Sequence, residues 1–259
     1  DGTIVYKKNE LITSGFTNQQ GIIIFDNLIT GDYYIKEIST PSNYEESDNK
    51  IDIYLNADKE LTIENTKKKV ELIINKKDLE TNKNLKNSLT TFKIKNKATN
   101  EYIKINDNEL IQVNSNGQII IKDLEYGTYE IEEIGSDDEY NKNEEIKEII
   151  INDETVTNKK IEINFYNEAK KYTIKINKID STTKESIENV EFGIYATEDI
   201  KLLDETIIYN KDELIKTEKT NNKGEVIFNE LVTGNYYIKE ISTPSNYEES
   251  DNKINIYLS

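Results

Sequence analysis

The sequence predicts an all-β protein, made of Ig-like β-sandwich modules that follow one another in a linear array. Three observations carry this prediction. Short runs alternate apolar and polar residues with a period of two, turn residues separate these runs, and long segments recur along the chain. No segment shows sustained helical periodicity with capping residues, so helices are not expected.

The clearest alternating runs lie between turn signals that contain glycine. Strands are expected at residues 33–38, 119–122, 128–134, 160–167 and 172–178. The turn signals are Thr30-Gly31, Asn116-Gly117, Gly127 and Lys223-Gly224. The 17 Tyr and the many Ile favour half-buried strand surfaces, which argues against the disorder that 32% charged residues alone would suggest.

Sequence repeats set the domain organisation. Gly31–Leu55 and Gly234–Leu258 differ at only two positions, and the offset between them is 234 − 31 = 203. Between them, Asp123–Ile134 is a weaker copy of Asn27–Ile38. Val70–Asp78 also matches Tyr172–Asp180, at an offset of 172 − 70 = 102. The chain is therefore predicted to be a tandem array with a period near one hundred residues.

This period divides the chain into three predicted modules. Residues 1–68 form a module that lacks its first strands, residues 69–170 a complete module, and residues 171–259 a module that lacks its last strand. The chain thus starts inside one module and stops inside another. The expected linkers, Thr66–Lys69 and Glu168–Lys171, are short and leave little free rotation between modules.

The composition excludes several classes of function. All 33 basic residues are Lys, against 50 acidic residues, and the net charge is −17. Without His or Cys there is no imidazole or thiol nucleophile, no disulfide and no ordinary zinc site, so no substrate-turning enzyme, cofactor or metal is expected. The negative charge argues against nucleic acid and anionic membranes as partners, and no apolar run approaches the roughly 20 residues of a membrane span.

Candidate reactive residues lie on the inward faces of three strands in the complete module. Each apolar face ends, in phase, on one polar residue. The faces are Val70, Leu72, Ile74 and then Lys76; Tyr129, Ile131 and then Glu133; and Ile161, Ile163, Phe165 and then Asn167. The third module repeats the pattern with Ile174, Ile176, Lys178 and with Tyr236, Ile238, Glu240, and the first with Tyr33, Ile35, Glu37 and with Leu61, Ile63, Asn65.

A buried Lys, Glu and Asn have complementary chemistry. Burial lowers the pKa of a lysine and raises that of a glutamic acid, which favours the neutral amine and the neutral acid. The amine can then attack the Asn amide while the carboxyl moves protons, giving a Lys–Asn isopeptide bond with loss of ammonia. The alternative is that each polar residue stands where its strand meets water, but recurrence at one strand phase in different modules favours the reactive group.

These residues resemble a known family. Lys-x-Asp after an alternating strand, Gly-x-Tyr-x-x-x-Glu followed by Pro-x-x-Tyr, and a late strand ending in Asn are similar to Cna-B-type and SpaA-type domains, the prealbumin-like sandwiches of Gram-positive adhesins and pilins. The resemblance covers essentially the whole chain. It implies a reactive lysine at Lys76 and Lys178, a catalytic glutamate at Glu37, Glu133 and Glu240, and an acceptor asparagine at Asn65 and Asn167.

Two departures from the family pattern matter. The first module lacks its Lys strand and the third its Asn strand, so neither is expected to close a bond from residues of this chain. The middle module has Gly135-Ser136-Asp137-Asp138 where its neighbours have Ser-Thr-Pro-Ser, which is expected to loosen that loop while leaving the triad intact. Asp137-Asp138-Glu139 lacks the spacing and Gly of an EF-hand loop, so a solvated loop is favoured over a Ca²⁺ site.

The resulting prediction is a structural stalk or fibre segment of a bacterial extracellular surface protein, mechanically stabilised by self-formed isopeptide bonds. Its expected location is the cell wall, a pilus or a spore appendage. The expected partners are neighbouring repeats of the same or adjacent chains, with any host or cell-surface ligand bound through regions outside this piece. The alternatives are a ligand-binding adhesin module and a subunit of a spore-surface filament. Near-identical repeats favour the stalk, because a stalk needs copies and a specific site needs only one.

Overall fold

The computed structural model describes residues 3–259, and the described residues form strands and connections without any helix. None of the described residues therefore lies in a helix able to cross a membrane. The chain divides into two compact units, Asp1–Thr66 and Lys67–Ser259. The all-β sandwich fold predicted from the alternating runs is confirmed.

The first unit contains one antiparallel hairpin, formed by β1 (Gly31–Lys36) and β2 (Lys50–Leu55). Tyr33 and Ile35 lie on its half-buried face, as the alternation predicts. The later alternating run does not form a strand: Leu61 and Ile63 are 44% and 50% exposed. The prediction that they point inward is wrong here, because no described strand of this unit pairs with the run.

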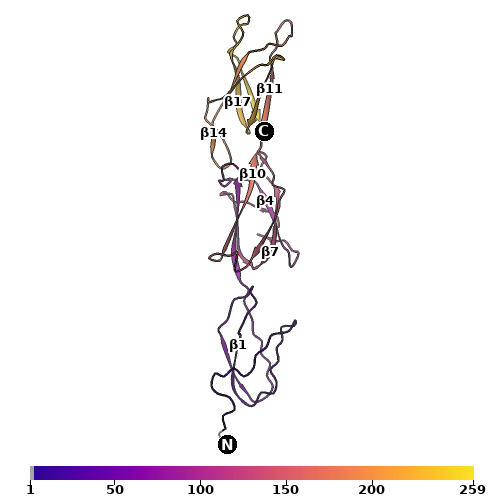
Figure 1. The fold of residues 1–259 in the computed structure, drawn as a ribbon, viewed down its shortest axis with the longest axis vertical. Coiled ribbons are helices and arrows are strands. Elements are labelled where there is room, and N and C mark those ends of the chain that lie inside the picture. The colour runs from indigo at the N-terminus through magenta and orange to yellow at the C-terminus, as the bar shows by residue number, and fades with distance from the viewer. Residues whose placement is uncertain (1–2) are drawn as a thin grey trace. The chain divides into compact units, whose positions relative to one another are not determined.

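The middle region of the second unit, residues 67–170, is a sandwich of two four-stranded sheets, which face each other in Figure 1. One sheet has the order β6-β3-β10-β8 and the other the order β5-β4-β7-β9. The strands are β3 (Lys69–Asp78), β4 (Thr91–Asn96), β5 (Ile111–Gln112), β6 (Gln118–Glu125), β7 (Gly127–Gly135), β8 (Tyr140–Asn141), β9 (Ile146–Ile151) and β10 (Lys160–Ala169).

Neighbouring strands in this sandwich are antiparallel except for β3 and β10, which run parallel. The region therefore begins and ends on two adjacent strands. The inward residues predicted for β3 and β7 are buried, with Leu72, Ile74 and Ile131 fully enclosed. The alternation thus correctly places the core between the two sheets.

The C-terminal region has a similar layout. Its sheets have the orders β11-β16 and β15-β12-β17-β18, and a separate hairpin is formed by β13 and β14. The strands are β11 (Tyr172–Asn177), β12 (Glu191–Ala196), β13 (Ile200–Lys201), β14 (Ile207–Tyr209), β15 (Leu214–Lys219), β16 (Glu225–Leu231), β17 (Gly234–Ser242) and β18 (Lys253–Leu258). The β13–β14 hairpin was not expected from the sequence.

Candidate functional site: a buried Lys–Glu–Asn group

The three polar residues predicted for the middle region meet in its core. Lys76 Nζ lies 2.7 Å from Glu133 Oε2, and Asn167 Nδ2 donates to Glu133 Oε1 at 2.6 Å. Lys76 and Glu133 are 0% exposed and Asn167 is 2% exposed. One carboxylate therefore touches both nitrogens, with a separate oxygen for each.

Strand register explains how the group assembles. In the parallel β3–β10 pair, Lys76 lies opposite Phe165. Asn167 comes two residues after Phe165 on β10, so its side chain projects from the same face of the sheet. Glu133 reaches the pair from β7 in the other sheet. Phe92, the partner of Glu133 on β4, packs edge-on against Phe165 with ring centroids 5.0 Å apart. The aromatic pair forms an apolar wall beside the polar group.

The apolar surroundings change the chemistry of the lysine. Burial lowers the pKa of Lys76, although the hydrogen bond and charge of Glu133, and then the charge of Asp137, act to raise it. Asn167 Oδ1 is buried without a hydrogen-bond partner among the described residues. The site thus holds a lysine biased towards its nucleophilic form, next to an amide whose carbonyl oxygen is not bound elsewhere.

Asp137 holds the loop after β7 in place. Its carboxylate accepts hydrogen bonds from Ser88 Oγ at 2.5 Å, from the Leu89 N–H at 2.7 Å and from Thr90 Oγ1 at 3.3 Å, and it is 7% exposed. The expectation that Gly135-Ser136-Asp137-Asp138 loosens this loop is wrong, because the buried carboxylate ties it to the connection before β4. The described residues hold no group of three or more His, Cys, Asp or Glu side chains that could hold a metal ion.

We expect Asp137→Ala to lower the free energy of unfolding of the middle region by about 1–3 kcal/mol, because the buried hydroxyls of Ser88 and Thr90 would lose a hydrogen-bond acceptor. Urea unfolding measures the change. Asp138→Ala is the matched control, since the neighbouring carboxylate is exposed and its loss should change stability by less than about 0.5 kcal/mol. Equal effects of the two substitutions would contradict this role for Asp137.

The other two modules each bring two of the three predicted groups together. In the C-terminal region, Lys178 Nζ lies 2.8 Å from Glu240 Oε2, and the lysine side chain is 29% exposed. In the first unit, Asn65 Nδ2 donates to Glu37 Oε1 at 2.8 Å. The remaining oxygen of each glutamate, Glu37 Oε2 and Glu240 Oε1, is buried without a partner among the described residues.

Two further buried residues, Asp78 and Tyr140, were not predicted to have a role. Tyr140 donates its hydroxyl proton to Asp78 Oδ2 at 3.2 Å, and both are nearly inaccessible. Burial and then the charge and hydrogen bond of Asp78 raise the pKa of Tyr140 above its ordinary value. The sequence did carry a signal for Asp78: an aspartate stands two residues after the predicted reactive lysine in both modules, as Asp78 after Lys76 and Asp180 after Lys178.

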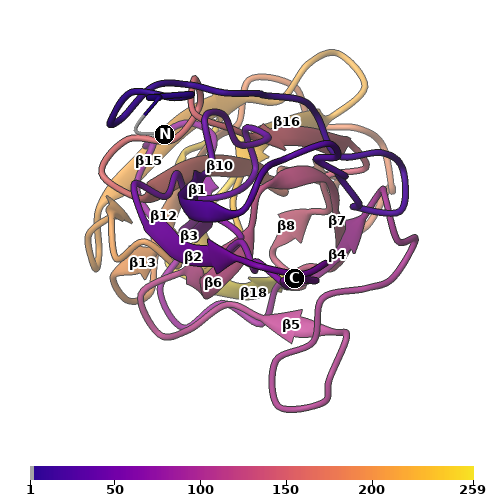
Figure 2. The same cartoon turned by 90° about the horizontal axis from the view of Figure 1, so that it is seen from below.

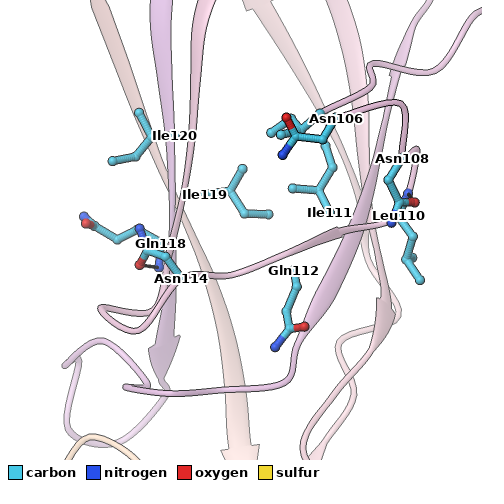
Figure 3. A pocket seen from close by; sticks show the side chains of 10 residues that line it. Asn106, Asn108, Leu110, Ile111, Gln112, Asn114, Gln118, Ile119 and Ile120 are labelled. Atoms are coloured by element: carbon cyan, nitrogen blue, oxygen red, sulfur yellow. Dashed lines mark hydrogen bonds between the residues drawn. The ribbon is translucent and has the colours of Figure 1, made fainter.

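A cleft in the middle region lies between β5 and β6. It has a volume of about 440 Å³, and Figure 3 shows Gln112, Asn114 and Gln118 among its lining side chains. The connection that leads into β5 projects from the side of the molecule (Figure 2). The lining amides serve local structure: Asn114 Oδ1 accepts the N–H groups of Asn116 and Gln118, and Gln118 Nε2 donates to Asn75 Oδ1. They therefore provide no evident ligand site.

The fold and the buried group define a class: repeated β-sandwich modules, of which the middle one holds a buried Lys–Glu–Asn group between its two sheets. The family described as "SpaA: Prealbumin-like fold domain" matches residues 3–69, 70–167 and 172–259. The chain belongs to this family.

Solved structures extend the comparison. The Bacillus anthracis TIE protein is similar at 25% identity with a TM-score of 0.69, over 94% of this chain and 42% of its own length. A streptococcal ancillary pilin matches at 16% identity and a TM-score of 0.34, over 90% of this chain and 72% of its own. The shaft pilin SpaA of Lactobacillus rhamnosus GG matches at 14% identity and a TM-score of 0.31, over 73% of this chain and 93% of its own. Likeness at the two lower scores carries no functional argument. No curated protein matches the sequence.

Proposed function

We propose that the chain is a stalk or fibre segment of a bacterial surface protein, and that its middle module closes an isopeptide bond between Lys76 and Asn167. The observation that carries the proposal is the buried carboxylate of Glu133, which touches both the lysine nitrogen and the amide nitrogen of the asparagine. A purely structural salt bridge would need only the first of these contacts.

The reaction balances without a cofactor. The Lys76 ammonium gives a proton to Glu133, and the neutral Nζ attacks Cγ of Asn167. Glu133 then gives its proton to the departing Nδ2 and receives one from Nζ. The Nζ–Cγ bond forms, the Cγ–Nδ2 bond breaks, and ammonia leaves. Each transfer uses a Glu133 oxygen that already lies within 2.7 Å of the nitrogen concerned, which is the reach that general acid–base catalysis requires.

The organisation of the chain supports the structural role. The family matches three times in succession, and segments 203 residues apart are almost identical. We assign the modules to residues 1–68, 69–170 and 171–259. The first and third, with two of the three groups each, close no bond from residues of this chain. We further propose that the protein lies at the cell surface, with neighbouring modules of the same or adjacent chains as its partners.

The mass of the intact chain tests the bond. We expect the wild-type protein to be lighter than its sequence by one ammonia, and Lys76→Ala and Glu133→Ala each to have the unmodified mass of the variant. Lys77→Ala is the matched control, because its lysine lies next to Lys76 on β3 and donates to the Asn82 carbonyl instead. Digestion should yield a branched peptide that contains both Lys76 and Asn167. A wild-type chain of full mass would reject the bond.

A further inference from the structure

The β13–β14 hairpin of the C-terminal region docks on the middle region. Its tip, residues 202–206, contacts a loop of the middle region that we call the platform, residues 79–86. The Leu203 carbonyl accepts the N–H of Lys86 at 2.9 Å, Thr81 Oγ1 donates to Asp204 Oδ2, and Lys83 Nζ donates to Thr206 Oγ1 at 2.9 Å.

Asp204 is the buried centre of this contact, at 5% exposure. Burial acts to raise its pKa, but hydrogen bonds from Thr81 and Thr206 outweigh burial, so the pKa is lowered and the carboxylate stays charged. The contact also has an apolar part. Leu85 and Tyr140 of the middle region are 0% and 2% exposed because they pack into the C-terminal core with residues such as Leu202.

The platform is joined by backbone hydrogen bonds to both predicted reactive residues. The Leu85 N–H donates to the Lys76 carbonyl at 2.9 Å, and the Leu79 N–H donates to the Asn167 carbonyl at 2.9 Å. Tyr140 pairs with Ala169, two residues after Asn167. The hairpin tip therefore covers the end of the sandwich at which the Lys–Glu–Asn group lies.

We propose that the hairpin tip is a lid over the isopeptide site, so that docking of the third module promotes bond formation in the second. This inference rests on the proposed function. It adds an interaction surface between two modules that controls how fast the bond forms. Asp204 and Thr81 act as positioning residues, since neither touches the reacting atoms. The lid works by excluding water from Lys76, whose nucleophilic form depends on burial.

The charged groups that face Lys76 are Glu133 on β7 and Asp137 in the loop that follows. Both carboxylates favour the ammonium form, so desolvation alone favours the amine.

The test follows the loss of ammonia in full-length protein made by cell-free synthesis, by intact mass over time and across a pH series. We expect Asp204→Ala and Thr81→Val each to slow bond formation at neutral pH by about tenfold, the change for one unit in the pKa of the amine. At alkaline pH the rates should approach the wild-type rate, because an exposed lysine is deprotonated there. Asp204→Asn should recover part of the rate, since its amide oxygen can still accept the Thr81 proton.

Glu188→Ala is the matched control, because it removes an exposed carboxylate of the same module, outside the hairpin. Combining Asp204→Ala with Thr81→Val should slow the reaction no more than Asp204→Ala alone, since that change already breaks the Thr81–Asp204 hydrogen bond. Wild-type rates and pH profiles in both single variants would overturn the lid, even with the bond present. Slow reaction at every pH would also overturn it, in favour of a general folding defect. Absence of the bond from the wild type would instead reject the proposed function.

Discussion

We expect the middle module to lengthen by roughly 300 Å under tension in Lys76→Ala, whereas the wild-type module does not unravel. Single-molecule pulling at the two ends of the chain measures the difference. The bond would enclose 167 − 76 = 91 residues, and an unfolded chain extends by about 3.3–3.6 Å per residue. In the wild type with the bond in place, only the parts of the module outside Lys76–Asn167 could be extended.

The placement of the proposed bond would explain the size of this effect. Force that enters at Val70 would run along β3 to Lys76, cross the bond to Asn167 and leave through Glu168. The strands between Lys76 and Asn167 would then carry little load. Lys77→Ala should behave as the wild type, because it leaves the bond intact. Equal extension of the wild type and Lys76→Ala would contradict the mechanical role, even if the mass shows the bond.

The second large effect is on thermal stability. We expect Glu133→Gln to lower the free energy of unfolding of the middle module by about 4–5 kcal/mol, the chain-entropy value for a cross-link that closes a loop of this length. Its unfolding temperature should fall by roughly 20 °C, since 1 kcal/mol corresponds to about 4–8 °C in a domain of this size. Glutamine keeps the size of the side chain but has one acceptor oxygen where the carboxylate has two, so either Lys76 Nζ or Asn167 Nδ2 also loses its acceptor. The value for the missing bond is therefore the lower bound of the expected loss.

Lys76→Met removes the bond from the other side of the ion pair. It leaves the buried carboxylate of Glu133 without its cation, just as Glu133→Gln leaves Lys76 without its anion. Differential scanning calorimetry should therefore place the transitions of both variants below that of the wild type. If Glu133→Gln unfolded at the wild-type temperature, the triad would be a hydrogen-bonded core group and not a cross-link.

The sequence predicted the sandwich and the Lys–Glu–Asn group because both depend on the period of a strand. A pleat places Val70, Leu72, Ile74 and Lys76 on one face whatever the neighbouring strands are. Their burial followed once β3 had partners on both sides. In the first unit, Leu61 and Ile63 have the same period but no described partner strand, so periodicity alone did not bury them.

Two features could not be read from the sequence because they depend on contacts between distant segments. Asp204 and Thr81 are 204 − 81 = 123 residues apart, and no periodic pattern links a hairpin tip to a loop of the preceding module. Asp137 looked like one of several acidic loop residues. Its burial depends on Ser88 and Thr90, which lie 49 and 47 residues earlier.

The parallel pairing of β3 and β10 has a consequence for damage by proteases. The chain enters and leaves the middle module on adjacent strands. A bond between Lys76 and Asn167 would therefore make the residues between them a closed loop, whose ends are joined directly. With the bond in place, a protease that cuts an exposed turn such as Asn106-Asp107 leaves the two halves covalently joined. A surface fibre built this way keeps its continuity after a cut that would divide an ordinary polypeptide.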